Sequence, residues 1–324
     1  MAKVSVLVAV YNAAPYIDQC LDSLLKQTLD DIQIICIDDC STDDSLSILN
    51  NYSLQDGRVE VIHLDENHGQ AHARNVGLQC ATGEYTCMLD ADDWFSCDAI
   101  EKAVAAFDAD TDCVLFDVAM EWGNRSEKYS MPDFKLLPGH DAFVLSLTWQ
   151  IHGLYMVRTA IHKQYPYDET CRLYSDDNTT RIHYLMSRQV RRCDGVYYYR
   201  QNPQSATHAV SVRRFDYLRA NESMKAQLLS HGVSKDALCL YENHRWLNLI
   251  DVYMFYHCHA TELPAEDSKY GLCELHRIWE DIDRTLLNKK TITKFGYRPM
   301  PSWLLFRIQE WIYFTIRGLL GKNY

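Results

Sequence analysis

Five short runs of apolar and β-branched residues recur along the first 118 residues, and helix-like segments separate them. The runs cover residues 4–10, 32–37, 59–64, 85–89 and 113–118. Each run is apolar on both faces, which is typical of strands buried inside a parallel sheet. Strands that alternate with helices at this spacing are joined by right-handed crossovers. The pattern predicts an α/β fold with an open, doubly wound, mostly parallel sheet that carries helices on both faces.

The helix-like segments also carry start signals. Pro15 stands where the first turn of a helix would begin, and Ile17, Cys20 and Leu21 then recur at helical spacing. Ser41 and Asp44 have the spacing of a capping box ahead of a second helix. Ligands of such sheets bind beyond the carboxyl ends of the strands, which is where the functional residues are expected.

The second half of the chain follows a different pattern. Residues 119–213 are less regular, and helical patterns with many aromatic side chains dominate residues 214–324. The last segment, 302–324, is apolar but contains Arg307, Glu310 and Arg317, so it is a poor candidate to span a bilayer. It is interpreted as an amphipathic helix that either lies on a membrane surface or packs on the protein or on a second subunit. The sequence leaves these alternatives, including a homodimer, open.

Composition excludes some functions. Asp and Glu outnumber Lys and Arg by 44 to 32, a net charge of −12, whereas a free-standing nucleic-acid binder is normally basic. The chain has 12 cysteines but no C-x-x-C pair, and no cleavable signal is recognised at its start. We therefore expect reduced thiols, a cytoplasmic protein and no nucleic-acid partner.

Acidic residues follow two of the predicted strands. Asp38 and Asp39 come after the second strand, and Asp90, Asp92 and Asp93 come after the fourth. Turn chemistry explains any one of them, but two clusters on one sheet edge repel each other unless a cation lies between them. Carboxylate oxygens suit Mg²⁺ or Mn²⁺. No glycine-rich phosphate loop follows the first strand, which argues against a dinucleotide-dependent dehydrogenase and a P-loop enzyme.

Four motifs in order resemble the nucleotide-binding half of the family-2 glycosyltransferases of GT-A fold. They are VSVLVAVYNAAPYIDQCLDSLLKQT, IICIDDCSTDDS, ENHGQAHARNVGL and GEYTCMLDADDW. The resemblance is strong over residues 3–118 and continues more weakly through YSDDNTTRIHYL and YYYRQNPQSATH to about residue 208. It implies a catalytic domain over residues 1–213, with a nucleotide-binding half (1–118) and an acceptor-side half (119–213), followed by a helical C-terminal region (214–324).

The resemblance also implies roles for residues of the first half. Ala9 and Tyr11 would line the pocket for the nucleotide base, and Asp39 would accept a hydrogen bond from the base, typically uracil. Arg74 matches the arginine of the family's A-R-N-x-G element and would orient the nucleotide. Asp38 is expected to support the turn beside Asp39.

The metal site is expected at the D-x-D string. The resemblance implies that Asp92 contacts Mn²⁺ or Mg²⁺ directly, and that Asp90 lies near the ribose or behind the metal. Asp93 is expected to be structural. His208 is either a further metal ligand or an ordinary solvated loop histidine.

A pair of acids in the second half provides the expected catalytic base. Asp176 and Asp177 match an acidic pair, commonly Glu-Asp, whose second member takes the proton of the acceptor hydroxyl, which makes Asp177 the base. Aid of this kind is worth roughly 10²–10⁴-fold in rate. The departure from Glu leaves the role of Asp176 open. The alternative is helix capping, because Ser175 followed by two acids makes a good helix start.

Three more residues complete the predicted site. The YYYRQNPQSATH segment is expected to close over the diphosphate, with Arg200 and Ser205 contacting phosphate oxygens. Trp149 lies where related enzymes form part of the acceptor side, but it is equally well explained as a core residue.

The expected function is a metal-dependent, inverting transfer of a sugar from a nucleotide-diphosphate sugar, typically a UDP-sugar. The acceptor would be a hydroxyl of a glycan or lipid-linked acceptor in bacterial surface-polysaccharide synthesis, at the inner face of the plasma membrane. The alternatives are a nucleotidyltransferase of similar fold and a non-catalytic nucleotide-sugar-binding protein.

Overall fold

The computed structural model describes residues 2–201 and 210–322, which form two compact units. The first unit contains residues 2–172 and 176–201, and the second contains residues 173–175 and 210–322. All strands of the described residues belong to the first unit, and the second unit is helical.

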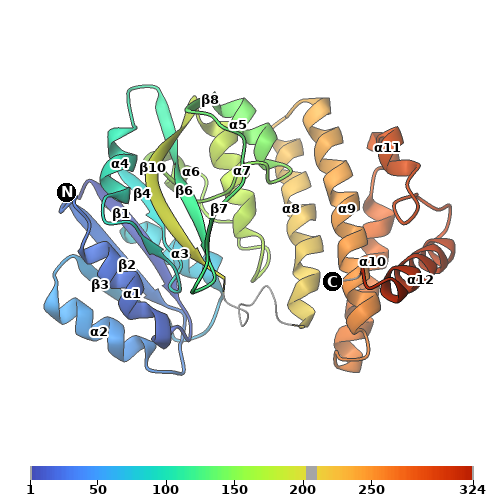
Figure 1. The fold of residues 1–324 in the computed structure, drawn as a ribbon, viewed down its shortest axis with the longest axis horizontal. Coiled ribbons are helices and arrows are strands. Elements are labelled where there is room, and N and C mark those ends of the chain that lie inside the picture. The colour runs from blue at the N-terminus through green and yellow to red at the C-terminus, as the bar shows by residue number, and fades with distance from the viewer. Residues whose placement is uncertain (1, 202–209, 323–324) are drawn as a thin grey trace. The chain divides into compact units, whose positions relative to one another are not determined.

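A ten-stranded mixed sheet forms the centre of the first unit, in the order β3-β2-β1-β4-β9-β6-β10-β5, with β7 beside β6 and β8 beside β10 (Figure 1). The strands are β1 (Val4–Val10), β2 (Ile32–Asp38), β3 (Val59–His63), β4 (Tyr85–Met88), β5 (Trp94–Phe95), β6 (Thr111–Glu121), β7 (Ser126–Lys128), β8 (Leu136–Pro138), β9 (Tyr155–Arg158) and β10 (Gln189–Arg200). The five predicted runs are all strands. The pairs β3–β2, β2–β1 and β1–β4 are parallel, and so is the pair β6–β10. The predicted α/β fold is confirmed. The sheet also contains antiparallel strands: β9 lies between β4 and β6, and the short strands β5, β7 and β8 pair antiparallel with β10 or β6.

Burial explains why the N-terminal strands are apolar on both faces. Every residue of β2 is buried, and β1 is buried except for the partly exposed Ala9. Four helices connect the runs: α1 (Ala14–Leu25), α2 (Ser45–Gln55), α3 (Gln70–Cys80) and α4 (Ala99–Ala105). α1 has Pro15 in its first turn and buries Ile17, Cys20, Leu21 and Leu24, as its spacing predicts.

The predicted capping box is wrong. α2 begins at Ser45 after Asp44, which makes no side-chain cap. The Ser41 hydroxyl instead accepts a hydrogen bond from the backbone N–H of Asn12 at 3.0 Å. The Ser45 hydroxyl likewise accepts from the N–H of Ala13 at 2.9 Å. These side chains hold the turn after β1, so they satisfy backbone donors of another segment rather than those of their own helix.

Three more helices belong to the first unit: α5 (Gly139–Ser146), α6 (Thr159–Gln164) and α7 (Asp176–Met186). α5 packs on α7, and α6 contacts α3, α7 and β9. Figure 1 shows α5, α6 and α7 gathered on the side of the sheet where β6 and β10 lie. This packing carries the start of α7 to the binding edge of the sheet.

The second unit contains α8 (Asp216–Ser230), α9 (Lys235–His259), α10 (Ala265–Asp281), α11 (Lys289–Ile292) and α12 (Trp303–Leu319), with short 3₁₀ turns at Val212–Phe215 and Arg284–Leu286. Its core contains the buried side chains of Trp246, Trp279, Phe306 and Phe314. The predicted helical C-terminal region is therefore confirmed. Across residues 2–201 and 210–322, none of the helices has both the length and the apolar character that a membrane span requires.

Candidate active site

The carboxyl ends of β2 and β4 lie at one edge of the sheet, two strand positions apart. Both strands pair in parallel with β1, which separates them. Asp38 ends β2 and Asp39 follows it, while Asp90, Asp92 and Asp93 follow β4. The two acidic clusters are thus brought to the same edge, where ligands of α/β sheets bind.

Arg74 on α3 joins one of these clusters to α7. Its guanidinium donates to Oδ1 of Asp90 at 2.5 Å and to Oδ2 of Asp176 at 2.6 Å. The residue is 1% exposed, and burial disfavours its charge, but the two carboxylates raise the pKa of Arg74 above its usual value. The side-chain amide of Gln70, one helical turn earlier, also donates to Oδ2 of Asp176 at 2.7 Å. A buried cation of this kind needs such partners, so the network fixes α7 against the end of β4.

Close packing of α3 on the sheet places Arg74. A Cβ atom built on Gly77 would lie 2.5 Å from Cδ1 of Ile37, so any side chain at this position would require the end of the Ile37 side chain to move. Ala73 and Leu78 are buried in the same interface.

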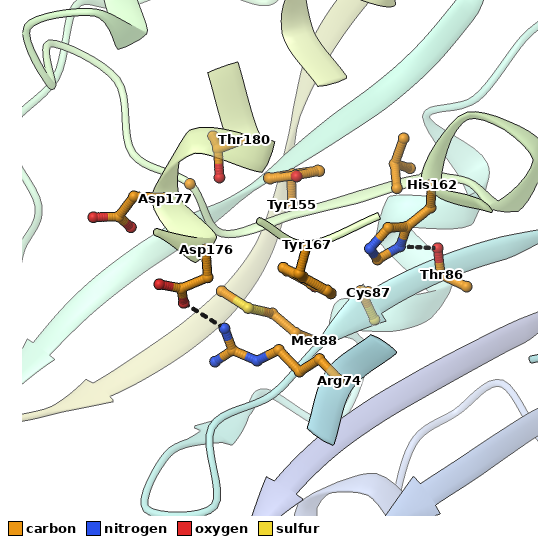
Figure 2. A pocket seen from close by; sticks show the side chains of 12 residues that line it. Arg74, Thr86, Cys87, Met88, Tyr155, His162, Tyr167, Asp176, Asp177 and Thr180 are labelled. Atoms are coloured by element: carbon orange, nitrogen blue, oxygen red, sulfur yellow. Dashed lines mark hydrogen bonds and ion pairs between the residues drawn. The ribbon is translucent and has the colours of Figure 1, made fainter. Parts of the chain in front are cut away.

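Asp177 lies beside the Arg74–Asp176 ion pair at the start of α7 (Figure 2). Burial, followed by the negative charge of Asp176, raises the pKa of Asp177 to about 7, while Arg181 and Arg74 act in the opposite direction. A carboxylate that gives up its proton near neutral pH is a suitable general base. Both the catalytic and the capping interpretation place Asp177 in the first helical turn, and the perturbed environment favours the catalytic one.

A cavity of about 30 Å³ lies against this pair. Its wall includes Arg74, Asp176, Asp177 and Thr180, with the rings of Tyr155, Tyr167 and His162 (Figure 2). Nδ1 of His162 shares a hydrogen bond of 2.7 Å with the Thr86 hydroxyl, and its Nε2 is buried without a partner within the described chain. The space suffices for about two water molecules.

The turn after β4 is tied to β10 by Asp93. Its carboxylate accepts from the Tyr197 hydroxyl and from the backbone N–H of Arg200, both at 2.7 Å. Burial, then the charges of Asp90 and Asp92, raise the pKa of Asp93. These contacts agree with the structural role expected for Asp93.

Asp92 lies in the same turn, and its role as a metal ligand stays a prediction. Burial, followed by the charge of Asp90, raises the pKa of Asp92 to about 6. No described side chain hydrogen-bonds its carboxylate, so a cation could bind there. The described residues include no group of three or more His, Cys, Asp and Glu side chains arranged around a metal position. One or two carboxylates completed by phosphate oxygens and water are, however, the usual setting of Mg²⁺, and Asp90 and Asp92 fit that pattern.

Arg200 holds the same turn from the end of β10. Its Nε donates to the backbone carbonyl of Asp92 at 2.7 Å, and a terminal nitrogen donates to Oε1 of Gln19 on α1 at 2.5 Å. The guanidinium also lies 4.8 Å from the ring of Trp94 and 5.1 Å from that of Tyr16. These contacts place Arg200 next to the D-x-D turn, and the phosphate contact stays a prediction. Ser205 and His208 lie outside the described residues.

The proposed base-binding residues surround the ends of β1 and β2. Asp39 is 2% exposed, and its two oxygens accept from the backbone N–H groups of His68 and Gly69, both at 2.8 Å. Its carboxylate therefore fixes the loop that leads into α3, a role that the sequence did not indicate, and its contact with a base stays a prediction. Tyr11, directly after β1, is 49% exposed, and Ala9 is partly buried near the end of β1.

Trp149 and several unpredicted residues complete the surroundings of α7. The Arg181 guanidinium lies 4.4 Å from the Trp149 ring, which places this ring beside α7. The sequence interpretation missed Gln70, His162, Tyr167 and Thr180. Only Gln70 had a usable signal, since it is four residues before Arg74 on the same helix face.

A mostly parallel sheet whose strand ends carry a D-x-D turn, followed by an acidic helix start, is the GT-A type of transferase architecture. Comparison of families agrees: residues 5–166, half of the chain, match the model described as glycosyl transferase family 2. The chain therefore belongs to glycosyl transferase family 2.

Individual proteins give the extent of the likeness. A putative glycosyltransferase of Bacillus subtilis, EpsH, is 43% identical over 119 residues, which cover 37% of this chain and 34% of EpsH. This chain thus matches about a third of the length of that relative.

Two solved structures show the same fold. One is residues 1–349 of S. aureus TarS in complex with UDP-GlcNAc, with a TM-score of 0.73 and 19% identity, covering 99% of this chain and 92% of that chain. The other is the mannosyltransferase PcManGT of Pyrobaculum calidifontis in complex with GDP-Man and Mn²⁺, with a TM-score of 0.55 and 18% identity, covering 99% and 88%.

Proposed function

We propose that this chain transfers a sugar from a nucleotide-diphosphate sugar to an acceptor hydroxyl with inversion at the anomeric carbon, using Asp177 as the general base. The observation that carries the proposal is the Arg74 ion pair with both Asp90 and Asp176. It joins the D-x-D turn, where a diphosphate would be neutralised, to the start of α7, where Asp177 stands. We therefore propose that the sugar donor binds, and the catalytic base acts, at one site of the first unit.

In the proposed reaction the Asp177 carboxylate takes the proton of the acceptor hydroxyl. At the same time, the oxygen of that hydroxyl attacks the anomeric carbon of the sugar. The bond from that carbon to the diphosphate breaks, and the nucleotide diphosphate leaves with an additional negative charge. Arg74 and Asp176 hold the start of α7 so that the base keeps its position. A divalent cation held by Asp92, with Asp90 beside it, would supply Lewis-acid stabilisation of the leaving diphosphate.

The donor proposed is a UDP-sugar, with Mn²⁺ or Mg²⁺ as the cation. The UDP-GlcNAc complex of TarS supports the nucleotide, and the Mn²⁺ in the PcManGT structure supports the metal, although the latter holds GDP-Man. Residues 1–118, with Ala9, Tyr11 and Asp39, would bind the nucleotide, and residues 119–213 would face the acceptor. We assign the acceptor to the class of bacterial surface glycans or lipid-linked glycans, modified in the cytoplasm.

The test separates binding from transfer. Binding is read as the rise in melting temperature caused by UDP with Mn²⁺, compared with GDP and Mn²⁺, because a ligand of the native state stabilises it by mass action. Turnover is read as UDP release from a panel of UDP-sugars, with water or a glycan as acceptor. Asp177→Asn should keep the thermal shift and lose at least about a hundredfold in turnover.

The matched control is Asp194→Asn, an exposed acid of the same unit, which should change neither readout. Unchanged turnover of Asp177→Asn would remove this residue from the mechanism. A wild-type protein that is stabilised by UDP but releases none from any donor would instead be a nucleotide-sugar binder.

A further inference from the structure

The last long helix, α12, has two different faces. Phe306, Gln309, Glu310 and Phe314 are buried and pack on the second unit. The opposite face is apolar but exposed, and its residues recur every three or four positions, so they form one continuous stripe. The stripe, called here the outer face, consists of Leu304, Leu305, Ile308, Trp311, Ile312, Ile316 and Leu319, which are 41–84% exposed. One face of the helix therefore packs on the protein, and contact of the other face with a membrane or a second subunit stays a prediction.

The segment around α12 has the opposite charge to the rest of the chain. Residues 284–322 contain eight Lys and Arg residues and one acid, whereas the whole chain carries −12. The single acid, Glu310, is fully buried, and burial raises its pKa to about 8, so it adds no exposed negative charge. The positive charge of this segment is therefore not offset locally.

Basic residues of the segment lie on α11 and in the loop that follows it. The loop after α11 packs on α12, because Nε2 of Gln309 donates to the carbonyl of Arg298 at 3.0 Å and the rings of Phe295 and Tyr313 are 5.3 Å apart. The side chains of Lys289, Lys290, Lys294 and Arg298 are exposed, and none forms an ion pair with any residue that the structure describes. These four residues, two on α11 and two in the loop after it, are together called the basic loop.

We propose that the outer face of α12 and the basic loop together bind an anionic lipid surface, with α12 lying in the plane of the interface. A stripe of Leu, Ile and Trp flanked by Lys and Arg is the composition of helices that insert at the boundary between headgroups and acyl chains. Anionic headgroups attract the adjacent basic residues. The surface does not depend on Asp177 or on the donor site, so the two proposals are tested separately.

The positive charge of the basic loop argues against a second copy of the chain as the partner that covers the outer face. In a two-fold dimer the same surface meets itself, so the basic loops of both copies would lie close to the shared interface and repel each other. A bilayer rich in phosphatidylglycerol has the complementary charge. The apolar stripe and the uncompensated positive charge are then satisfied by the same partner.

The experiment is vesicle co-sedimentation of the full chain, with phosphatidylcholine vesicles and with vesicles that also contain phosphatidylglycerol. We expect binding to the anionic vesicles that weakens with added salt, and little binding to the neutral ones. Ile308→Asp/Ile312→Asp, which places two charges on the outer face, should lower the vesicle partition coefficient at least about tenfold. Lys289→Glu/Lys290→Glu/Lys294→Glu should lower it by a similar factor.

The control variants make the same kinds of substitution at exposed positions away from the outer face and the basic loop. Leu54→Asp changes an exposed leucine on α2, and Lys235→Glu/Lys269→Glu reverses two exposed lysines of the second unit; both should bind vesicles like the wild type. Melting temperatures establish that each variant is folded. Full binding by both the outer-face and the basic-loop variants would overturn the proposal, as would equal binding to neutral and anionic vesicles. A wild-type dimer that ignores vesicles and dissociates in Ile308→Asp/Ile312→Asp would identify a second copy as the occupant.

Discussion

Replacement of Arg74 by methionine tests whether the buried ion pairs hold the candidate site together. The substitution keeps an unbranched side chain of similar length but removes the cation that faces Asp90 and Asp176. Removing one partner of a fully buried ion pair costs about 3–5 kcal/mol, because the other charge is left without compensation. Asp176 retains 11% and Asp90 32% side-chain exposure, so water recovers part of this loss. We therefore expect a loss of about 3 kcal/mol in the free energy of unfolding.

The assay is unfolding by heat and by urea, monitored by circular dichroism, and the quantity measured is the transition of the first unit. For a unit of about 200 residues, 1 kcal/mol corresponds to roughly 2–4 °C, so the melting temperature should fall by about 6–12 °C. Arg125→Met is the control, because the Arg125–Glu127 pair is exposed and such pairs contribute about 0–1 kcal/mol.

A loss below about 1 kcal/mol at neutral pH, which is the size expected for an exposed ion pair, would refute the assigned role of the buried ion pairs.

Three further predictions concern packing, pH and metal. Gly83→Ala should destabilise the chain by about 1–3 kcal/mol in urea unfolding, because a Cβ there would lie 2.5 Å from the backbone nitrogen of Ser5. Turnover should fall as pH drops through about 7, because a raised pKa leaves Asp177 protonated below that value, and a flat rate profile would contradict its role as base. EDTA should abolish turnover, and Asp92→Asn should raise the Mn²⁺ concentration needed for half-maximal turnover about tenfold or more; an unchanged requirement would remove Asp92 from the metal site.

The strand pattern explains how much of the first unit could be predicted. A strand buried on both faces must be apolar throughout, so β1, β2 and β6 are visible as runs in the sequence. The antiparallel position of β9 was not predictable, because its four residues have the same character in either direction and the neighbours that decide it are β4 and β6. The capping box failed for a similar reason, since a serine hydroxyl serves any nearby backbone donor and Ser41 found one in another segment.

The sequence by itself determined the α/β class, the acidic strand ends and the two-sided pattern of α12, because each depends on residues close together along the chain. Only the tertiary structure decided that Arg74 joins Asp90 to Asp176, which lies 102 positions after Arg74 in the chain. The same holds for Asp39, which accepts hydrogen bonds from the backbone N–H groups of His68 and Gly69. Likewise, which face of α12 is buried depends on the packing of the second unit. Periodicity records whether a side chain is buried or exposed, whereas a buried charge is satisfied by whichever partner the folded chain brings within hydrogen-bonding distance.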